Sequence, residues 1–342
     1  MDSDVLFLGM GHDGGVTHYR SVLPSRLLGL PFLSQDHRGK VDFADSSLKG
    51  GEKFPVVIMQ MPSWEFQFRQ IIKLRNEGSI VIANIDDWIP AISRLTDGRH
   101  SFGEAIKKNH RGWFLKCLQV VDGYIASTPW LLNKLSHFDR DKPAWLCRNG
   151  LDLERYNVPD LQRDSGTVIG WSGGTGHWGA FDKISAELND ILWNHPSVQF
   201  VGVGDNVASL LDSRLGDRVH HLPWQDLWMY PRDLKMFDIA LAPAEENDFY
   251  RAKSQLRLYE MGAVGACPVV APMYDEVVDG VTGFIASESG DWYSVLNNLV
   301  IDSDIRESVA ASAFDYVHSS CGIEHRRGEW EAALDGARSL YH

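Results

Sequence analysis

The sequence lacks the patterns that mark metal-binding, disulfide-rich and membrane-spanning proteins. Its 342 residues include four scattered cysteines with no CxxC pair and thirteen histidines with no HExxH motif. No apolar run approaches the roughly 20 residues that a membrane-spanning helix needs. The opening stretch MDSDVLFLGMG is acidic and is not typical of a signal peptide. We therefore predict a cytoplasmic protein with reduced thiols, no membrane span and no built-in metal centre. The cysteines are Cys117, Cys147, Cys267 and Cys321.

Positive charge is also scarce. The chain has 33 lysines and arginines against 46 acidic residues, a formal net charge of −13. This balance argues against broad nonspecific affinity for nucleic acids or anionic membranes. Segment 94–116 is an exception, with six basic residues against two acidic ones, together with His100 and His110. The local excess fits either a surface that meets an anionic acceptor or the solvated face of a helix. The basic residues are Arg94, Arg99, Lys107, Lys108, Arg111 and Lys116, and the acidic ones are Asp97 and Glu104.

Short apolar runs alternate with helical segments along the whole chain. Runs such as VLFLG, PVVIMQM, SIVIANI and GYIAS, and later TVIGWSG, VQFVGVG, IALAP and CPVVAP, are typical of parallel strands buried on both faces. Helical patterns lie between them, one of them after the cap-like pair Thr128-Pro129. We predict an α/β fold of two Rossmann-like, doubly wound parallel-sheet domains, 1–153 and 154–322. A polar linker over about 152–165 is expected to join them, and an amphipathic helix is expected at about 323–342.

The segment from Arg251 to Phe284 has the most distinctive pattern. Ser254 is expected to cap a helix that ends at Gly262 and Gly265, and the apolar run CPVVAP then predicts a buried strand. A tight turn with two glycines, Gly280 and Gly283, follows. The segment therefore predicts a helix, a strand and a turn in immediate succession.

Three charged residues are expected on one face of that helix. Lys253, Arg257 and Glu260 are spaced at roughly i, i+4 and i+7. Two cations near a helix N-terminus suit phosphate groups, and a carboxylate suits the hydroxyls of a ribose. The alternative is a surface helix with an Arg257–Glu260 ion pair, which binds nothing.

Glycines also follow the first strand. Gly9, Gly11 and Gly14 have the spacing of a dinucleotide-binding fingerprint, and Asp36 lies at a suitable distance for a ribose contact. A nicotinamide- or flavin-dependent oxidoreductase is therefore an alternative. No hydride-transfer site is recognisable later in the chain.

The chain resembles glycosyltransferase family 4 and its relatives, which have the two-domain GT-B fold. The matched signature is a helix with Glu260 and Gly265, a Pro-Val-Val strand at 268–270, and a Glu-Val-Val-Asp-Gly turn at 276–280 followed by Gly283-Phe284. The resemblance spans nearly the whole chain and is strongest in the second half. It implies a nucleoside-diphosphate sugar as donor substrate, retention of anomeric configuration, no catalytic metal and no permanently bound cofactor. It also implies that the last helix packs against the first domain.

The resemblance places the donor site in the second half of the chain. There the loop 170–177 follows a strand, and its backbone amides are expected to bind anions. The family usually has an arginine and a lysine in this loop, and neither is present here. Ala252 stands where the family commonly has a glutamate, beside Lys253-Ser254, a variant that resembles capsular and phage-type members. The expected donor-binding residues are Gly173, Gly174, His177, Gly204, Arg251, Lys253, Ser254 and Glu260.

The first half is expected to bind the acceptor. Gly14 and Gly15 continue into a Tyr-Arg pair, ending in Arg20, that resembles the opening of sugar transferases. Asp86 and Asp87 follow a predicted strand and are candidates to orient or deprotonate an acceptor hydroxyl, with Lys253 as a further catalytic residue. The alternative is exposed acid at a strand end. The expected acceptor is a glycan, a small molecule or a hydroxymethylated DNA base, and a catalytically inactive nucleotide- or sugar-binding module remains an alternative.

Overall fold

The computed structural model describes residues 4–11, 14–36, 38–39, 41–42, 53–92, 109–159 and 166–341. The chain divides into two compact units. Unit 1 comprises Met1–Gly150, Asn247–Ser254 and Ile323–His342, and unit 2 comprises Leu151–Glu246 and Gln255–Gly322. The short segment Asn247–Ser254 therefore belongs to unit 1, although it lies deep in the second half of the sequence. Most of the basic segment, from Arg94 to Lys108, and the end of the expected linker lie outside the described residues.

Unit 1 is built on one seven-stranded sheet, with strand order β3-β2-β1-β4-β5-β6-β7. All neighbouring strands pair in parallel except β3, which pairs antiparallel with β2. Central strands such as β4 and β5 are buried on both faces, as their runs of Val and Ile predict. The strands are β1 (Val5–Met10), β2 (Phe32–Gln35), β3 (Val41–Asp42), β4 (Val56–Gln60), β5 (Ile80–Ile85), β6 (Gly123–Ala126) and β7 (Ala144–Leu146).

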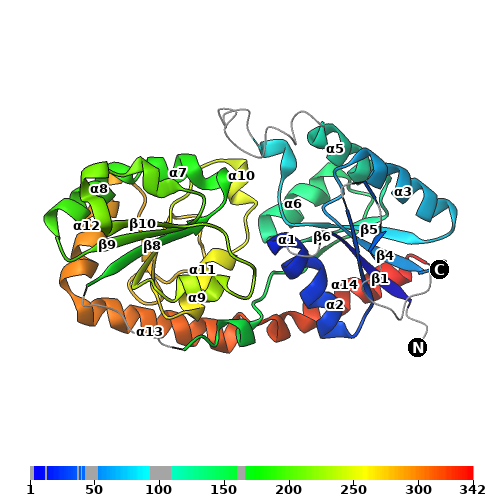
Figure 1. Cartoon of the computed structure of the whole chain (residues 1–342). Coiled ribbons are helices and arrows are strands. Elements are labelled where there is room, and N and C mark those ends of the chain that lie inside the picture. Colours follow the sequence, from blue (N-terminus) through cyan, green and yellow to red (C-terminus); the bar gives the residue numbers. More distant parts are fainter. Residues whose placement is uncertain are drawn as a thin grey trace. The chain divides into compact units, whose positions relative to one another are not determined.

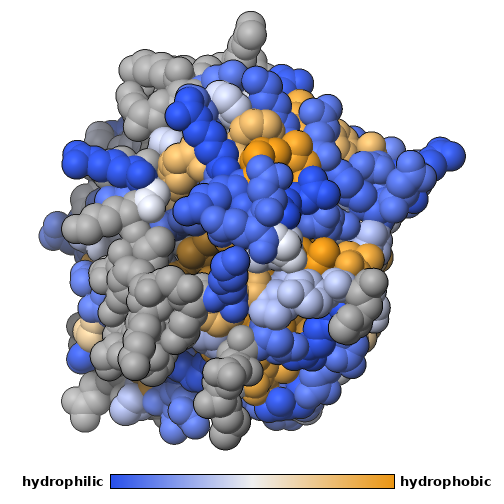
Figure 2. Space-filling view, turned by 90° about the vertical axis from the view of Figure 1, so that its right-hand side faces the viewer, coloured by the Kyte–Doolittle hydropathy of each residue, from blue (hydrophilic) through white to orange (hydrophobic). Residues whose placement is uncertain are grey.

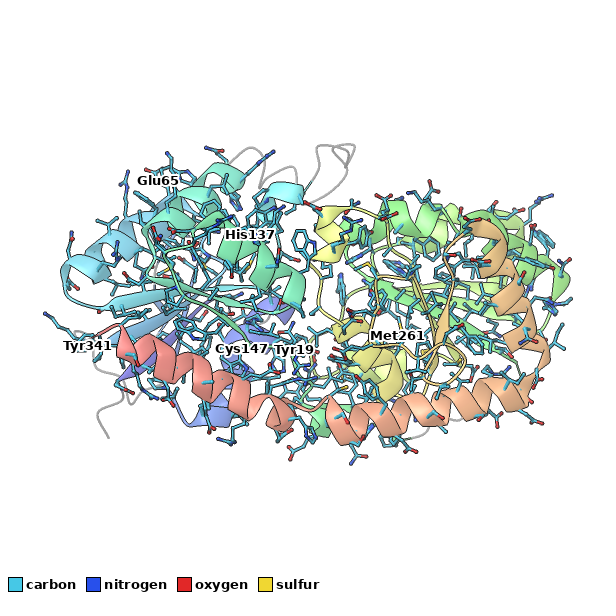
Figure 3. The ribbon with its side chains drawn as sticks, turned by 180° about the vertical axis from the view of Figure 1, so that it is seen from behind. Tyr19, Glu65, His137, Cys147, Met261 and Tyr341 are labelled. Atoms are coloured by element: carbon cyan, nitrogen blue, oxygen red, sulfur yellow. The ribbon has the colours of Figure 1, made fainter. Side chains whose placement is uncertain are left out.

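Helices cover both faces of this sheet (Figure 1). Helices α3 (Glu65–Asn76), α5 (His110–Val120) and α6 (Pro129–Phe138) pack on one face. Helices α2 (Leu23–Leu28) and α14 (Arg327–Ser339) pack on the other, where Trp330 and Leu334 join Cys147 in the core. Cys147 is labelled in Figure 3. The remaining helical elements are α1 (Gly15–Thr17), the π-helix η1 (His18–Val22), η2 (Ile89–Ala91), α10 (Asp248–Arg251) and η7 (Ile323–Arg326). Thr128 caps α6 as expected, because its Oγ1 accepts a hydrogen bond from Leu131 N at 3.1 Å.

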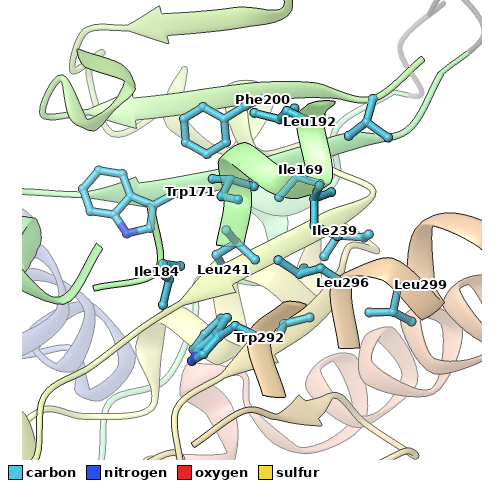
Figure 4. Packing of buried hydrophobic residues seen from close by; sticks show 14 of the residues in the cluster. Ile169, Trp171, Ile184, Leu192, Phe200, Ile239, Leu241, Trp292, Leu296 and Leu299 are labelled. Atoms are coloured by element: carbon cyan, nitrogen blue, oxygen red, sulfur yellow. The ribbon is translucent and has the colours of Figure 1, made fainter. Parts of the chain in front are cut away.

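Unit 2 has a six-stranded, fully parallel sheet in the order β10-β9-β8-β11-β12-β13. Its core, around Trp171, Phe200 and Leu296, fills the space between the sheet and its helices (Figure 4). The strands are β8 (Val168–Gly173), β9 (Gln199–Gly204), β10 (Val219–Leu222), β11 (Ile239–Ala242), β12 (Cys267–Val270) and β13 (Phe284–Ile285). The helical elements are η3 (Leu153–Tyr156), η4 (Thr175–His177), α7 (Trp178–Asp182), α8 (Ser185–Asn194), η5 (Val207–Leu210), η6 (Ser213–Arg218), α9 (Tyr230–Leu234), α11 (Leu256–Ala263), α12 (Ser289–Ile301) and α13 (Ser303–Ser320).

The predicted fold class is confirmed, because each unit is a doubly wound, Rossmann-like α/β sheet. In each sheet the strand order reverses once, between β1 and β4 in unit 1 and between β8 and β11 in unit 2. Such a reversal leaves a crevice at the carboxyl ends of the strands, where ligands bind in this architecture. The loops after β1 and β8 are therefore the places to look for function.

The distinctive segment 251–284 differs from its prediction in two ways. Ser254 does not cap a helix, because α11 begins after Gln255 and a separate short helix, α10, precedes it. Gly262 does not end α11 but lies inside it, where a Cβ would stand 2.7 Å from Val317 Cγ2. Gly262 therefore allows α11 and α13 to approach closely, and Gly265, with φ +76°, makes the left-handed turn after the helix.

The four cysteines are buried free thiols, as predicted. Within the described residues, no helix is long and apolar enough to cross a bilayer. The face of unit 1 that carries α3 is mostly hydrophilic, with small apolar areas between the charged side chains (Figure 2).

Candidate functional site

In unit 2, strand β8 ends in a glycine loop at the point where the strand order reverses. Gly173 O accepts a hydrogen bond from Asp205 N at 3.0 Å, which ties this loop to the one after β9. Gly174 has negative φ, and an added Cβ would meet nothing within 4 Å. The open space beside Gly174 is therefore available to a ligand, whereas Gly173 is closely surrounded. His177, at the end of η4, is half-buried on the same loop.

Local packing explains the third expected glycine, Gly204, without a ligand. Its φ is +99°, and a Cβ would lie 2.5 Å from Gly173 O and 2.7 Å from the ring of Trp224. Any larger residue would both strain the backbone and clash. His221 Nε2 lies 2.8 Å from Gly204 O and fixes the same turn.

Glu260 on α11 is held from both sides by tyrosine hydroxyls. The Tyr156 hydroxyl donates a hydrogen bond to Glu260 Oε1 at 3.2 Å. The Tyr230 hydroxyl lies 3.1 Å from Glu260 Oε2 and 3.0 Å from Ser172 Oγ, in the strand that leads into the glycine loop. This arrangement fixes the carboxylate beside the loop, and each oxygen keeps capacity to accept further hydrogen bonds. Neither tyrosine could be predicted from the sequence, because Tyr156 and Tyr230 lie 104 and 30 residues away from Glu260 along the chain.

Arg257 is not paired with Glu260. It makes no hydrogen bond or ion pair to any residue that the structure describes, which overturns the alternative of an ion-paired surface helix. Its guanidinium instead lies 5.8 Å from the ring centroid of Trp171.

The other expected donor residues group with unit 1. Lys253 Nζ donates a hydrogen bond to Asp87 Oδ1 at 2.6 Å, so Lys253, which was expected in both the donor and the catalytic set, directly contacts an expected catalytic carboxylate. Burial raises the pKa of Asp87, Lys253 opposes this increase, and Asp86 adds to it. Arg251 ends α10 and is exposed. Ser254 Oγ accepts a hydrogen bond from Asn149 Nδ2 at 2.9 Å.

Asn149 connects the expected acceptor residues. Its Nδ2 also donates to Asp86 Oδ1 at 3.0 Å, and its Oδ1 accepts from Arg20 Nη1 at 2.9 Å. One side chain thereby fixes Asp86, Ser254 and Arg20 together. The position of this amide could not be deduced from the sequence, because its partners are 63 to 129 residues away.

Arg20 was expected in the acceptor cleft, but the structure buries it completely. Its guanidinium donates to Asn84 Oδ1, to Cys147 O at 2.6 Å and to Asn149 Oδ1, and it lies 5.0 Å from the ring centroid of Trp330. Protein groups thus satisfy it, and its 0% exposure leaves no surface for a ligand. Arg20 instead supports Asn149, and through it Asp86.

The glycine turn after β1 does not have the packing of a dinucleotide fingerprint. In that fingerprint the third glycine permits close contact between helix and strand. Here the tightly packed residue is Gly9, where a Cβ would lie 2.8 Å from Phe32, whereas the nearest atom to a Cβ on Gly14 is 3.7 Å away. Gly15 is also open, and Asp36 Oδ1 accepts a hydrogen bond from Arg38 N within its own turn. The geometry therefore disfavours the oxidoreductase and leaves open space at Gly14 and Gly15.

No protein-family model matches the chain, and no curated protein sequence matches it. Among solved structures, it is similar to Anabaena HepE in complex with UDP-glucose, with 15% identity, a TM-score of 0.67, and coverage of 97% of this chain and 99% of HepE. A glycosyltransferase from Rickettsia africae has 10% identity and a TM-score of 0.66, with 99% of each chain covered. A putative UDP-N-acetylglucosamine 2-epimerase from Listeria monocytogenes has 11% identity and a TM-score of 0.59, with 99% and 98% covered. At these identities the likeness shows the fold alone, and the chain has the GT-B fold, with its two Rossmann-like units.

Proposed function

We propose that the protein transfers a sugar from a nucleoside-diphosphate sugar to an acceptor hydroxyl. One observation carries this proposal: the hydroxyl of Tyr230 contacts both Ser172, beside the open glycine loop, and the carboxylate of Glu260. The loop offers backbone amides to phosphates, and Glu260 offers hydrogen-bond acceptors to ribose hydroxyls. HepE supports the proposal, because it has the same fold and its structures contain UDP, glucose or UDP-glucose.

The donor groups are assigned as follows. Backbone amides around Gly173 and Gly174 bind the diphosphate, with His177 at the edge of the loop, and Glu260 binds the ribose. The sequence also assigned Arg251, Lys253 and Ser254 to the donor. Since Lys253 pairs with Asp87 and Ser254 pairs with Asn149, we reassign these two to the support of the acceptor residues.

The reaction breaks the bond between the anomeric carbon and the β-phosphate oxygen and forms a bond from that carbon to the acceptor oxygen. The acceptor hydroxyl loses its proton to the departing phosphate. When both events occur on one face of the sugar, configuration is retained, and neither an enzyme nucleophile nor a metal is needed. Asp86 and Asp87 orient the acceptor hydroxyl, and the open backbone at Gly14 and Gly15 admits it.

A thermal-shift screen with UDP, GDP, ADP and NAD tests the donor class. A ligand that binds only the folded protein raises the melting temperature. At a concentration of 100 times its Kd, it adds about 2.7 kcal/mol to the free energy of unfolding. We expect one nucleoside diphosphate to raise it and NAD to leave it unchanged. A response to NAD alone, or to none of the four, would contradict the proposal.

Product analysis then separates transfer from the alternatives. Incubation with the matching nucleotide sugar should release nucleoside diphosphate and leave the sugar on an acceptor or on water. A 2-epimerase, the activity named for the Listeria neighbour, would instead interconvert two nucleotide sugars. An inactive binding module would bind the nucleotide and turn nothing over. Mass spectrometry of glycans, small metabolites and DNA from cells that express the protein identifies the acceptor.

A further inference from the structure

The guanidinium of Arg257 lies against the glycine loop. Arg257 is in the first turn of α11, the helix marked by Met261 in Figure 3. A Cβ on Gly173 would stand 2.8 Å from Arg257 Nη2 and 2.6 Å from Trp171 Cζ2. A side chain at position 173 would therefore collide with Arg257 and with the ring of Trp171, which is labelled in Figure 4.

This guanidinium has an unmet hydrogen-bonding need. Arg257 Nη1 is buried and has no hydrogen-bond partner among the described residues, and the side chain forms no ion pair with them. A buried cationic donor without a partner is costly, and proteins normally pair it. Trp171 offers only its ring face. Glu260 on the same helix is held by Tyr156 and Tyr230, and burial raises the pKa of the nearby Tyr274 hydroxyl, which keeps that group neutral.

The position of Arg257 indicates what would satisfy it. The loop 170–176 contains no lysine or arginine, and the open space beside Gly174 adjoins the residue whose missing Cβ admits the guanidinium. An anion in that space would meet backbone amides on one side and the arginine on the other. A guanidinium binds two phosphate oxygens at once in a planar arrangement, which suits a diphosphate better than a single point charge would.

We infer that Arg257 is the cation that binds the diphosphate of the donor and stabilises the charge that develops on the β-phosphate as the sugar leaves. This inference rests on the proposed function and assigns a residue to it. The bond changes are those given above, and Arg257 neither gains nor loses a proton.

The test measures how strongly the binding affinity of two variants depends on the number of phosphates in the ligand. Isothermal titration measures the affinity of wild type, Arg257→Met and Arg257→Lys for UDP, UMP and uridine, or for the matching series if another base responds in the screen. Arg257→Met should weaken diphosphate binding about 10- to 100-fold and leave the nucleoside affinity unchanged. Arg257→Lys keeps the positive charge but lacks the planar pair of donors. Its affinity for the diphosphate should therefore lie between those of wild type and Arg257→Met. Arg214→Met is the matched control, because Arg214 lies in the same unit, is 78% exposed and pairs with Asp212 two residues away, and it should bind like wild type.

The outcomes distinguish the inference from the function on which it rests. If wild type binds no nucleoside diphosphate, the proposed function fails. If wild type binds one and Arg257→Met binds it equally well, only the role of Arg257 is overturned. A purely structural role predicts that Arg257→Met lowers the melting temperature of the ligand-free protein, and that uridine and UDP weaken together. The inference predicts an unchanged or higher ligand-free melting temperature, because an unpaired buried charge is removed, and a smaller shift with UDP. If Arg257→Met does not fold, the same comparison is made with Arg257→Lys.

Discussion

Lys253 donates a hydrogen bond to Asp87 at 2.6 Å, although the two residues are 166 positions apart in the sequence. Their side chains are only 24% and 22% exposed. Together with the ion pair between Lys134 and Asp248 at 3.3 Å, this contact fastens the segment 247–254 to unit 1. A ligand that needed the Lys253 ammonium would have to displace a carboxylate that already neutralises it.

A double-mutant cycle tests this pair. Lys253→Met and Asp87→Asn should each lower the free energy of unfolding by about 1–3 kcal/mol, because each leaves a largely buried charge without its partner. The double variant should lose less than the sum of the two. Urea denaturation of the four proteins measures the coupling. A coupling energy of zero would show that the ion pair contributes no net stability and would contradict this prediction.

Nucleotide affinity in the same four proteins then tests our reassignment of Lys253. We expect both single variants to lower the transfer rate to a similar extent and to bind the nucleoside diphosphate like wild type. If Lys253→Met alone weakens nucleotide binding, Lys253 belongs to the donor site, as the sequence first indicated.

Gly174 gives a test of the glycine loop with little risk to folding. Its φ is −97° and an added Cβ meets nothing within 4 Å, so Gly174→Ala should keep the stability of wild type. If a diphosphate occupies that space, the methyl group should weaken its binding at least about tenfold, as expected for the loss of one or more hydrogen bonds to a charged group. Gly290→Ala, in α12, also meets open space and serves as the control. Equal affinity in both variants would exclude the loop as the phosphate site.

Features that depend on local pattern could be predicted from the sequence. The buried strands β1, β4, β5, β8, β9 and β11 stand out as runs of Val, Ile and Leu, and Thr128-Pro129 begins α6 through a local hydrogen bond. The two-residue strand β13 carries almost no such signal. Spacing on an ideal helix put Lys253 on one face with Glu260, but the helix begins after Gln255, and a distant carboxylate determines where Lys253 lies.

For the site residues, too, local patterns could be predicted, whereas contacts between residues that are distant in the sequence could not. Glu260 was predicted from its motif, whereas the hydroxyls of Tyr156 and Tyr230 reach it only through the tertiary fold. Arg20 was predicted in a cleft from a loop pattern, but Asn84, Cys147 and Asn149 surround it once the sheet has formed. Burial of a charged side chain depends on partners that are 64 to 129 residues away, and no sequence window contains them.

Replacement of Arg20 should be among the most destabilising changes in unit 1. Arg20→Met leaves the acceptor oxygens of Asn84, Asn149 and Cys147 buried without their donor, so the free energy of unfolding should fall by about 3 kcal/mol or more. Arg20→Lys should also destabilise, because an ammonium cannot reproduce the planar arrangement of donors. Chemical denaturation measures both, with the exposed Arg214→Met as a control that should unfold like wild type. Wild-type stability in Arg20→Met would contradict the network.

The role of Glu260 can be tested with the ligand as well as the protein. If its carboxylate binds the ribose, a nucleoside diphosphate should bind wild type about 10- to 100-fold more tightly than its 2′,3′-dideoxy analogue does. Glu260→Gln should lose most of that preference, and binding of the dideoxy analogue should change little. Tyr156→Phe and Tyr230→Phe keep the carboxylate but remove the hydroxyls that hold it, so each should reduce the preference by less. Titration calorimetry on the four proteins gives the eight affinities. If Glu260→Gln weakens both ligands equally, Glu260 acts on the structure of α11 and not on the ribose.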